Sequence, residues 1–150
     1  MIVCKFGGSS LADGKQFAKV KAIVQQENRH VVVASAAGKR FKEDNKLTDL
    51  LYLVHAHLQY GVSYDELFAA IVERLCQIRD ELGLKTPIED QLAGLKKELC
   101  KGISRDYLVS RGEYFTSLLL LNIWVITFWM RKRRSCLITT ERSTLKEAMN

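Results

Sequence analysis

Two apolar, strand-like runs separated by one amphipathic helix constrain the fold of this chain more than any other feature of its sequence. The first run, IVCKF at 2–6, leads into two glycines, and the second, HVVVASAAG at 30–38, also ends in glycine. Between them, the segment at 13–28 places apolar side chains at helical spacing. A strand, a helix and a second strand of this length predict a right-handed βαβ unit with parallel strands. The predicted fold class is therefore α/β.

The remainder of the chain has the pattern of helices joined by short polar segments. A charged loop, KRFKEDNK at 39–46, precedes a helix for which Thr48 is a candidate N-cap. Ser63 and Glu66 have the spacing of a capping box at the start of another helix. The predicted helices cover 48–61 and 63–83, a segment that starts near Pro87, and 106–121.

Composition and charge place the chain among globular proteins. Its 150 residues are 47% hydrophobic and 27% charged, which suits one domain with a buried core. The formal charge of +6 is concentrated near the end, since 121–150 hold six Lys or Arg and two Asp or Glu. The single basic cluster, RKRR at 131–134, has no interleaved aromatic residues. No nucleic-acid partner is therefore predicted.

The cysteines argue against both a disulfide framework and a metal site. Cys4, Cys76, Cys100 and Cys136 lie far apart, and the sequence has no CxxC motif and no histidine at metal-ligand spacing. This usage favours a reducing, cytoplasmic location. The first residues lack a basic segment followed by a long apolar one, which argues against secretion.

The glycine-rich segment after the first strand is a candidate phosphate site. Ligands of an open parallel sheet bind outside the carboxyl ends of its strands, where KFGGSS and SAAGK are expected to lie side by side. Backbone N–H groups of Gly7, Gly8 and Ser9 can surround phosphate oxygens, and the next helix N-terminus adds partial positive charge. Lys5 would supply a full charge, although the residue order is not that of a Walker A loop. Taken alone, the segment is equally compatible with a structural turn.

Four segments, in this order and at this spacing, resemble the aspartate kinases of the amino acid kinase superfamily. They are KFGGSSLAD at 5–13, VVVASAAGK at 31–39, LTDLLY at 47–52 and SRGEY at 110–114. The opening KFGGSS and the SRGE element point to aspartate kinase more than to glutamate, acetylglutamate or uridylate kinases. The resemblance implies a three-layer αβα fold of the carbamate kinase-like type, with a parallel sheet that is incomplete in this chain.

The resemblance also implies a reaction, the ATP-dependent phosphorylation of the β-carboxylate of L-aspartate in lysine, threonine and methionine biosynthesis. It implies ATP with Mg²⁺ as cofactor and a homo-oligomeric parent enzyme. Lys5 would neutralise charge on the transferring phosphoryl group while Gly7, Gly8 and Ser9 hold phosphate oxygens. Positioning and charge stabilisation are the chemistry that phosphoryl transfer needs from a protein.

Three further residues match positions that bind aspartate in the family, and they are Ser35, Thr48 and Glu113. Two of them also have structural interpretations, because Ser35 can end a strand and Thr48 can cap a helix. An acid beside Arg111 in an apolar helical stretch must be solvated or paired. The carboxylate of Glu113 would hold the ammonium group of the substrate.

The sequence departs from the family after the SRGEY element. Residues 121–131 read LNIWVITFWMR, where an aspartate kinase is expected to continue with a segment such as LAEYLGYEFVDAEE. One choice of codons for these residues can be read in another frame, which starts at a G one nucleotide earlier. In that frame the same nucleotides encode AEYLGYHFLDA. We therefore interpret residues 1–117 as the N-terminal portion of the catalytic domain and 118–150 as an aberrant tail, out of frame to about residue 142. Such a fragment is expected to be inactive, because the family's distal catalytic segment and regulatory domains are missing.

Two other interpretations stay open. One is a nucleotide- or phosphate-binding half-domain without catalysis, and the other is a membrane-anchored protein that uses 115–134. The apolar segment before RKRR is sixteen residues long, shorter than the roughly 20 residues that span a bilayer, so no membrane partner is favoured. The frame interpretation predicts that Trp124, Phe128 and Trp129 pack poorly against the rest of the chain.

Overall fold

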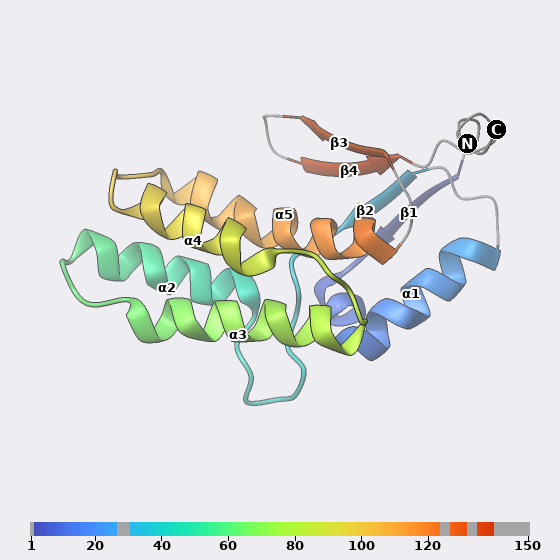
Figure 1. Ribbon diagram of the computed structural model, residues 1–150, viewed down its shortest axis with the longest axis horizontal. Helices are drawn as coiled ribbons and strands as arrows, with labels where there is room; N and C mark the ends of the chain where they lie inside the picture. The colour runs from blue at the N-terminus through green and yellow to red at the C-terminus, as the bar shows by residue number, and fades with distance from the viewer. Residues whose placement is uncertain (1, 27–30, 124–126, 132–134, 140–150) are drawn as a thin grey trace.

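The computed structural model describes residues 2–26, 31–123, 127–131 and 135–139, with side chains as far as residue 123. Strands occupy the two ends of this chain and helices its middle (Figure 1). In chain order the elements are β1 (Val3–Phe6), the short 3-10 helix η1 (Gly8–Leu11), α1 (Gly14–Gln26), β2 (Val31–Ala34), α2 (Leu47–Gln59), α3 (Asp65–Glu81), α4 (Ile88–Leu99), α5 (Arg105–Ile123), β3 (Thr127–Arg131) and β4 (Ser135–Thr139).

The strands form one sheet in the order β1-β2-β4-β3. β1 and β2 are parallel and joined through α1, in a register that pairs Cys4 with Val32 and Phe6 with Ala34. This arrangement confirms the predicted α/β class and its parallel strands. β4 is antiparallel both to β2 and to β3, so a hairpin from the predicted tail extends the parallel pair.

The helices pack on one another and on the sheet around a shared apolar core. Figure 1 shows α2, α3, α4 and α5 running side by side, and α5 also contacts β2 and β4. α1 packs against η1 and α3. Burial of large apolar side chains is the main favourable term in such packing. Among the most deeply buried are Phe17, Leu47, Leu51, Ile71, Leu75, Ile88, Leu92, Leu108 and Leu119.

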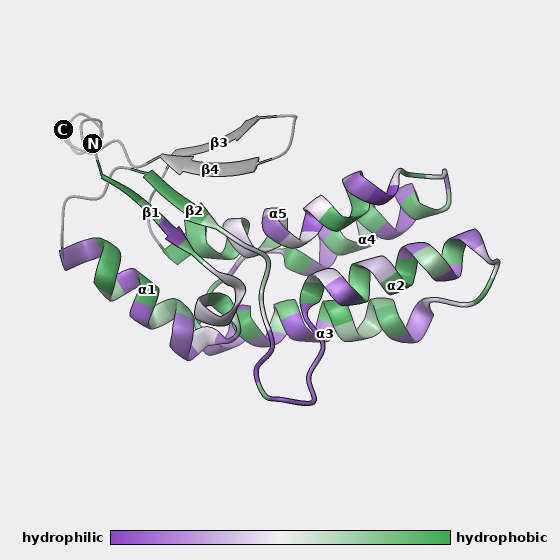
Figure 2. Ribbon diagram, turned by 180° about the vertical axis from the view of Figure 1, so that it is seen from behind, coloured by the Kyte–Doolittle hydropathy of each residue, from purple (hydrophilic) through white to green (hydrophobic). Residues whose placement is uncertain are grey.

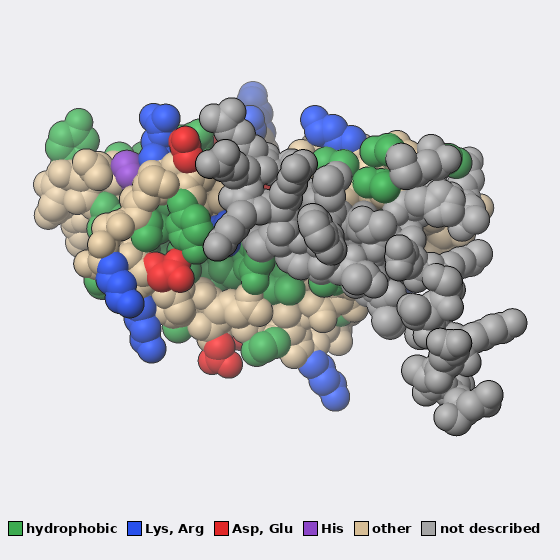
Figure 3. Space-filling view, turned by 90° about the horizontal axis from the view of Figure 1, so that it is seen from above, with side chains coloured by type: hydrophobic (Ala, Val, Ile, Leu, Met, Phe, Trp, Pro, Cys, Tyr) green, Lys and Arg blue, Asp and Glu red, His purple; other side chains and the backbone are tan. Residues whose placement is uncertain are grey.

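The charged segment at 39–46 forms the connection between β2 and α2, as predicted. Figure 2 shows it as a hydrophilic loop that extends beyond α3 at the bottom of the view, away from the strands. On the face seen in Figure 3, the Lys and Arg side chains of the described residues lie in several separate places. This distribution agrees with the nearly neutral charge of the chain before residue 121.

The start of α2 differs from the prediction. The helix begins at Leu47, and its N-cap is Lys46, which has extended backbone angles and makes no side-chain capping bond. Thr48 therefore lies inside the first turn and is not the N-cap. Tertiary contacts determine where the helix starts, because the Leu47 side chain is fully buried and the Leu47 N–H donates to the carbonyl oxygen of Ala37 at 3.1 Å.

The predicted capping box of the next helix is also wrong. α3 begins at Asp65 after the N-cap Tyr64, so Ser63 lies one residue too early to cap it. The Ser63 hydroxyl instead accepts a long hydrogen bond from the Asp65 N–H at 3.4 Å and donates to the Asp65 carboxylate at 3.1 Å. Pro87 is the N-cap of α4, in agreement with the prediction that a helix starts there.

α5 continues through the predicted boundary between residues 117 and 118. Leu119 and Leu120 are 0% exposed and belong to the core. The boundary and the frame interpretation stay predictions, and the predicted poor packing of Trp124, Phe128 and Trp129 concerns side chains outside the described residues. None of the described helices combines the length and the apolar character needed to cross a membrane.

Candidate functional site

A cavity of about 480 Å³ lies where the chain leaves β1 and β2. Its walls come from η1, the segment after β2, the start of α2 and the middle of α5. The residues that line it are Gly8, Ser9, Ser35, Ala36, Ala37, Gly38, Lys39, Lys46, Thr48 and Glu113. The two strand-end loops thus lie side by side, as the parallel strands predicted.

The two loops touch through a pair of glycines. The Gly38 N–H donates to the carbonyl oxygen of Gly8 at 2.8 Å. A Cβ atom on Gly8 would lie 2.8 Å from the Ala36 carbonyl oxygen, and one on Gly38 would lie 2.5 Å from the carbonyl carbon of Gly8. Because real Cβ atoms do not approach backbone this closely, both positions require glycine.

Most of the residues predicted to bind substrates line this cavity. Those that do are Gly8, Ser9, Ser35, Thr48 and Glu113. Lys5 is exposed on β1, and Gly7 is exposed between β1 and η1, so neither contributes to the lining. A Cβ on Gly7 would meet no atom within 4 Å, so its backbone faces open space.

α5 is fixed against the loop that follows β2. A Cβ on Gly112 would lie 3.0 Å from the Ala36 Cβ and 3.2 Å from a Leu51 methyl group, so the glycine allows close packing. The buried Thr116 hydroxyl accepts a hydrogen bond from the Ala37 N–H at 3.1 Å and donates to the Gly112 carbonyl at 2.8 Å. These contacts place Glu113 at the cavity wall. Sequence reasoning did not identify Thr116, because a hydroxyl in an apolar helix has no distinctive pattern.

The charges that line the cavity suit a ligand with both anionic and cationic groups. Half-buried Glu113 makes no hydrogen bond or ion pair with any described residue, so its carboxylate is available to a ligand. Lys39 and Lys46 contribute positive charge from the two ends of the loop. Sequence analysis missed both lysines, since a charged loop is usually a solvated surface.

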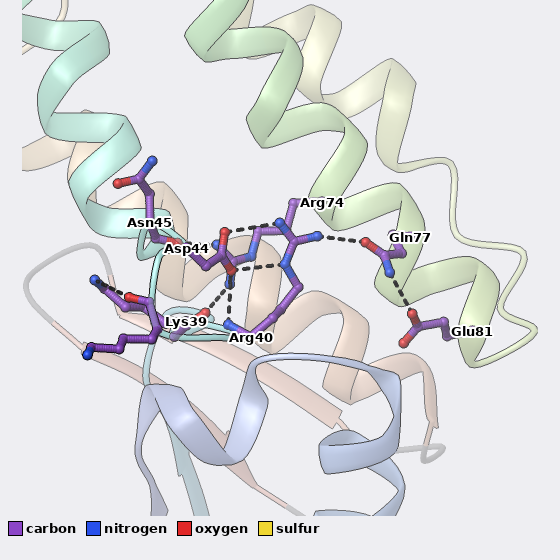
Figure 4. Close-up of polar contacts among 9 residues, drawn as sticks. Lys39, Arg40, Asp44, Asn45, Arg74, Gln77 and Glu81 are labelled. Atoms are coloured by element: carbon purple, nitrogen blue, oxygen red, sulfur yellow. Dashed lines mark hydrogen bonds and ion pairs between the residues drawn. The ribbon is translucent and has the colours of Figure 1, made fainter.

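The loop at 39–46 is closed by an ion pair (Figure 4). Arg40 binds the Asp44 carboxylate through Nε at 2.9 Å and a terminal nitrogen at 3.0 Å, and its backbone N–H donates to the same group at 2.9 Å. The side-chain hydrogen bond from Arg40, assisted by its backbone N–H and by the charge of Arg74, holds the pKa of the Asp44 carboxyl well below its usual range. Asp44 is therefore ionised at neutral pH.

Arg111 is close to Glu113 in the sequence, but its side chain packs against two tyrosine rings. Its guanidinium carbon is 4.3 Å from the centre of the Tyr107 ring and 4.9 Å from that of Tyr114. Such cation–π contacts explain how this arginine is accommodated without an acidic partner. Arg111 is not among the residues that line the cavity.

The described residues contain no cluster of three or more His, Cys, Asp or Glu side chains that would hold a metal ion by themselves. Glu113 is the single carboxylate that lines the cavity in this part of the chain. Mg²⁺ commonly binds through one or two carboxylates together with substrate phosphates. The described residues therefore offer a magnesium ion too few ligands of their own, so such an ion would be held mainly by the phosphates of a ligand.

Comparison with known proteins gives consistent matches. Residues 1–122 match the family described as the amino acid kinase family. The chain is 45% identical over 93 residues to aspartokinase 3 of Bacillus subtilis, a match that covers 61% of this chain and 20% of that protein.

Solved structures show the same similarity. The aspartate kinase of Clostridium acetobutylicum matches with a TM-score of 0.78 and 44% identity, over 82% of this chain and 29% of that chain. Aspartokinase III of E. coli, in complex with aspartate and ADP, matches with a TM-score of 0.66 and 28% identity, over 82% of this chain and 28% of that one. The chain therefore spans less than a third of the length of these relatives.

Proposed function

The chain belongs to the amino acid kinase family, and we propose that residues 1–122 are the part of an aspartate kinase that binds L-aspartate and the phosphates of ATP. The observation that carries the proposal is the single cavity lined both by Gly8 and Ser9 and by Ser35, Thr48 and Glu113. A phosphate cradle and an amino-acid site must adjoin for transfer between them.

The amino-acid half of the site would recognise aspartate through complementary groups. The Glu113 carboxylate, which has no partner among the described residues, would bind the substrate ammonium. Ser35 and Thr48 line the same cavity, and their hydroxyl groups would orient a substrate carboxylate. This placement would leave the β-carboxylate facing the glycine-rich segment.

The phosphate half would supply backbone donors and positive charge. In the proposed reaction a β-carboxylate oxygen attacks the γ-phosphorus of ATP, the bond to the bridging oxygen breaks, and ADP leaves with that oxygen. Lys5 precedes the glycines on β1 and would neutralise charge on the transferred group, with Lys39 and Lys46 acting on the ligand from the loop. A magnesium ion bound to ATP would add charge neutralisation at the phosphates.

A half-domain that binds ligand without turnover is the second candidate, because the chain spans less than a third of the length of its structural relatives. In the proposed function, catalysis belongs to a longer aspartate kinase of which these residues form a part. From the 150 residues alone we expect binding and no aspartate-dependent ATP turnover above background.

Replacing Glu113 with glutamine should weaken aspartate binding by about tenfold or more, since a charge-assisted hydrogen bond to the ammonium is lost. Isothermal titration calorimetry of the chain with aspartate, and separately with ATP and Mg²⁺, measures this change. Binding of ATP should change little.

The matched control is Glu66→Gln, which alters an exposed acid in the first turn of α3 outside the cavity. Aspartate affinity that is equal in the Glu113 and Glu66 variants would remove Glu113 from the proposed role. Detectable turnover that Glu113→Gln abolishes would show that the 150 residues already contain the catalytic groups.

A further inference from the structure

A buried arginine outside the cavity connects both ends of the loop at 39–46. Arg74 lies on α3 and is 2% exposed. Its guanidinium donates to the carbonyl oxygen of Gly38, just before the loop, and to that of Asn45, near the end of the loop. It also forms an ion pair with the Asp44 carboxylate at 3.2 Å (Figure 4).

This arrangement uses properties that only arginine has. The planar guanidinium presents several N–H donors in a fixed fork, so one side chain can bind two carbonyls and a carboxylate at once. Burial lowers the pKa of Arg74, and the charge of Asp44 opposes that effect. A buried charge is costly unless it is paired, which means that the loop and the arginine stabilise each other.

The same helix also contacts the start of α1. A terminal nitrogen of Arg40 donates to the Gln77 amide oxygen at 2.8 Å, and the Gln77 amide nitrogen donates to Glu81 at 2.8 Å. The other Glu81 oxygen accepts a hydrogen bond from the Gly14 N–H, again at 2.8 Å. One face of α3 thus holds both the loop after β2 and the helix that follows the glycine-rich segment.

We propose that Arg74, together with Asp44, is a positioning residue that fixes the loop at 39–46 along the cavity and holds Gly38 against Gly8. Arg74 does not line the cavity, so it acts through the backbone and through Lys39 and Lys46, which do. The inference rests on the proposed function only in taking the ligand to be the phosphates of ATP. The proposed role of Arg74 in ordering the loop does not depend on which ligand the cavity binds.

Hydrogen exchange of the chain without ligand tests loop order. In Arg74→Met, the amides of Gly38 and Leu47, which bind the carbonyls of Gly8 and Ala37, should exchange about tenfold faster or more, because hydrogen bonds to a charged group are lost. Trypsin should also cleave faster within the loop.

The control is Arg79→Met, which removes an arginine from the same helix whose partners are Asp80 and Glu89. It should leave both amides and the loop cleavage unchanged. If Arg74→Met does not fold, Asp44→Asn decides the result, and Asp44→Glu, which keeps the carboxylate, should restore slow exchange. Loop exchange in Asp44→Asn equal to that of the parent chain would overturn the inference.

ATP affinity separates positioning from general stability. ATP binding is measured with Mg²⁺ present, at a temperature where urea titration shows each variant to be fully folded. Arg74→Met and Asp44→Asn should each bind ATP about tenfold more weakly, because the ordered loop is lost. Unchanged ATP affinity with a disordered loop would overturn the positioning role. If the parent chain itself does not bind ATP, the proposed function fails, and the exchange data alone support or reject the role of Arg74 in ordering the loop.

Discussion

Replacing Gly38 with alanine is expected to destabilise the folded chain by about 1–3 kcal/mol or more. The added Cβ would lie 2.5 Å from the carbonyl carbon of Gly8, 2.7 Å from its oxygen and 2.7 Å from the Ser9 nitrogen. All three are backbone atoms, which cannot rotate away as a flexible side chain can. The loops must separate, and the hydrogen bond from the Gly38 N–H to Gly8 is lost with them.

Urea denaturation of Gly38→Ala beside Gly94→Ala measures this effect. Gly94 lies within α4, is exposed, and has nothing within 4 Å of an added Cβ. Alanine there should stabilise the chain by about 0.5–1 kcal/mol, because glycine is a poor helix former. If the two variants were equally stable, the close approach of the two loops would not exist in solution.

Ending the chain after Ser117 is expected to unfold it, whereas ending it after Ile123 should leave it folded. The shorter chain lacks Leu119 and Leu120, both 0% exposed in the core. Burial of one such side chain is worth about 1.5–3 kcal/mol, against a total stability of about 5–15 kcal/mol for a typical domain. The loss would take much of the available stability.

Circular dichroism and thermal unfolding of the two truncated chains measure the difference. Both lack β3 and β4, so the comparison isolates the contribution of residues 118–123. Equal stability would mean that the native fold ends near residue 117, as the frame interpretation places it. Greater stability of the longer chain would move the start of the aberrant tail beyond the end of α5.

The strand ends were predictable because their physical signals are local. An apolar run that leads into Gly7 and Gly8, or that ends at Gly38, predicts both a strand and a backbone that can approach another segment closely. Parallel pairing of the two runs then brings the loops together, which placed Ser9 and Ser35 at one cavity. The family resemblance identified Ser35, Thr48 and Glu113, and the packing of α5 against Ala36 explains where Glu113 lies.

Other parts of the site depend on tertiary contacts that no local pattern encodes. The start of α2 is set by burial of Leu47, so the capping preference of Thr48 did not decide it. The sequence pattern alone would place Arg74 on the exposed face of an amphipathic helix, yet the fold buries it beneath the loop. Lys39 and Lys46 were not identified as site residues because their loop is charged throughout, although both ends of the loop line the cavity.

We propose that the loops after β1 and β2 form one site for the phosphates of ATP. Two-dimensional NMR of the isotope-labelled chain, titrated with ATP and Mg²⁺, tests it most directly. We expect chemical-shift changes concentrated at the amides of Gly7, Gly8, Ser9, Gly38 and Lys39, and about tenfold weaker ATP binding in Lys5→Ala. Shift changes confined to other parts of the chain, or none at millimolar ATP, would contradict it.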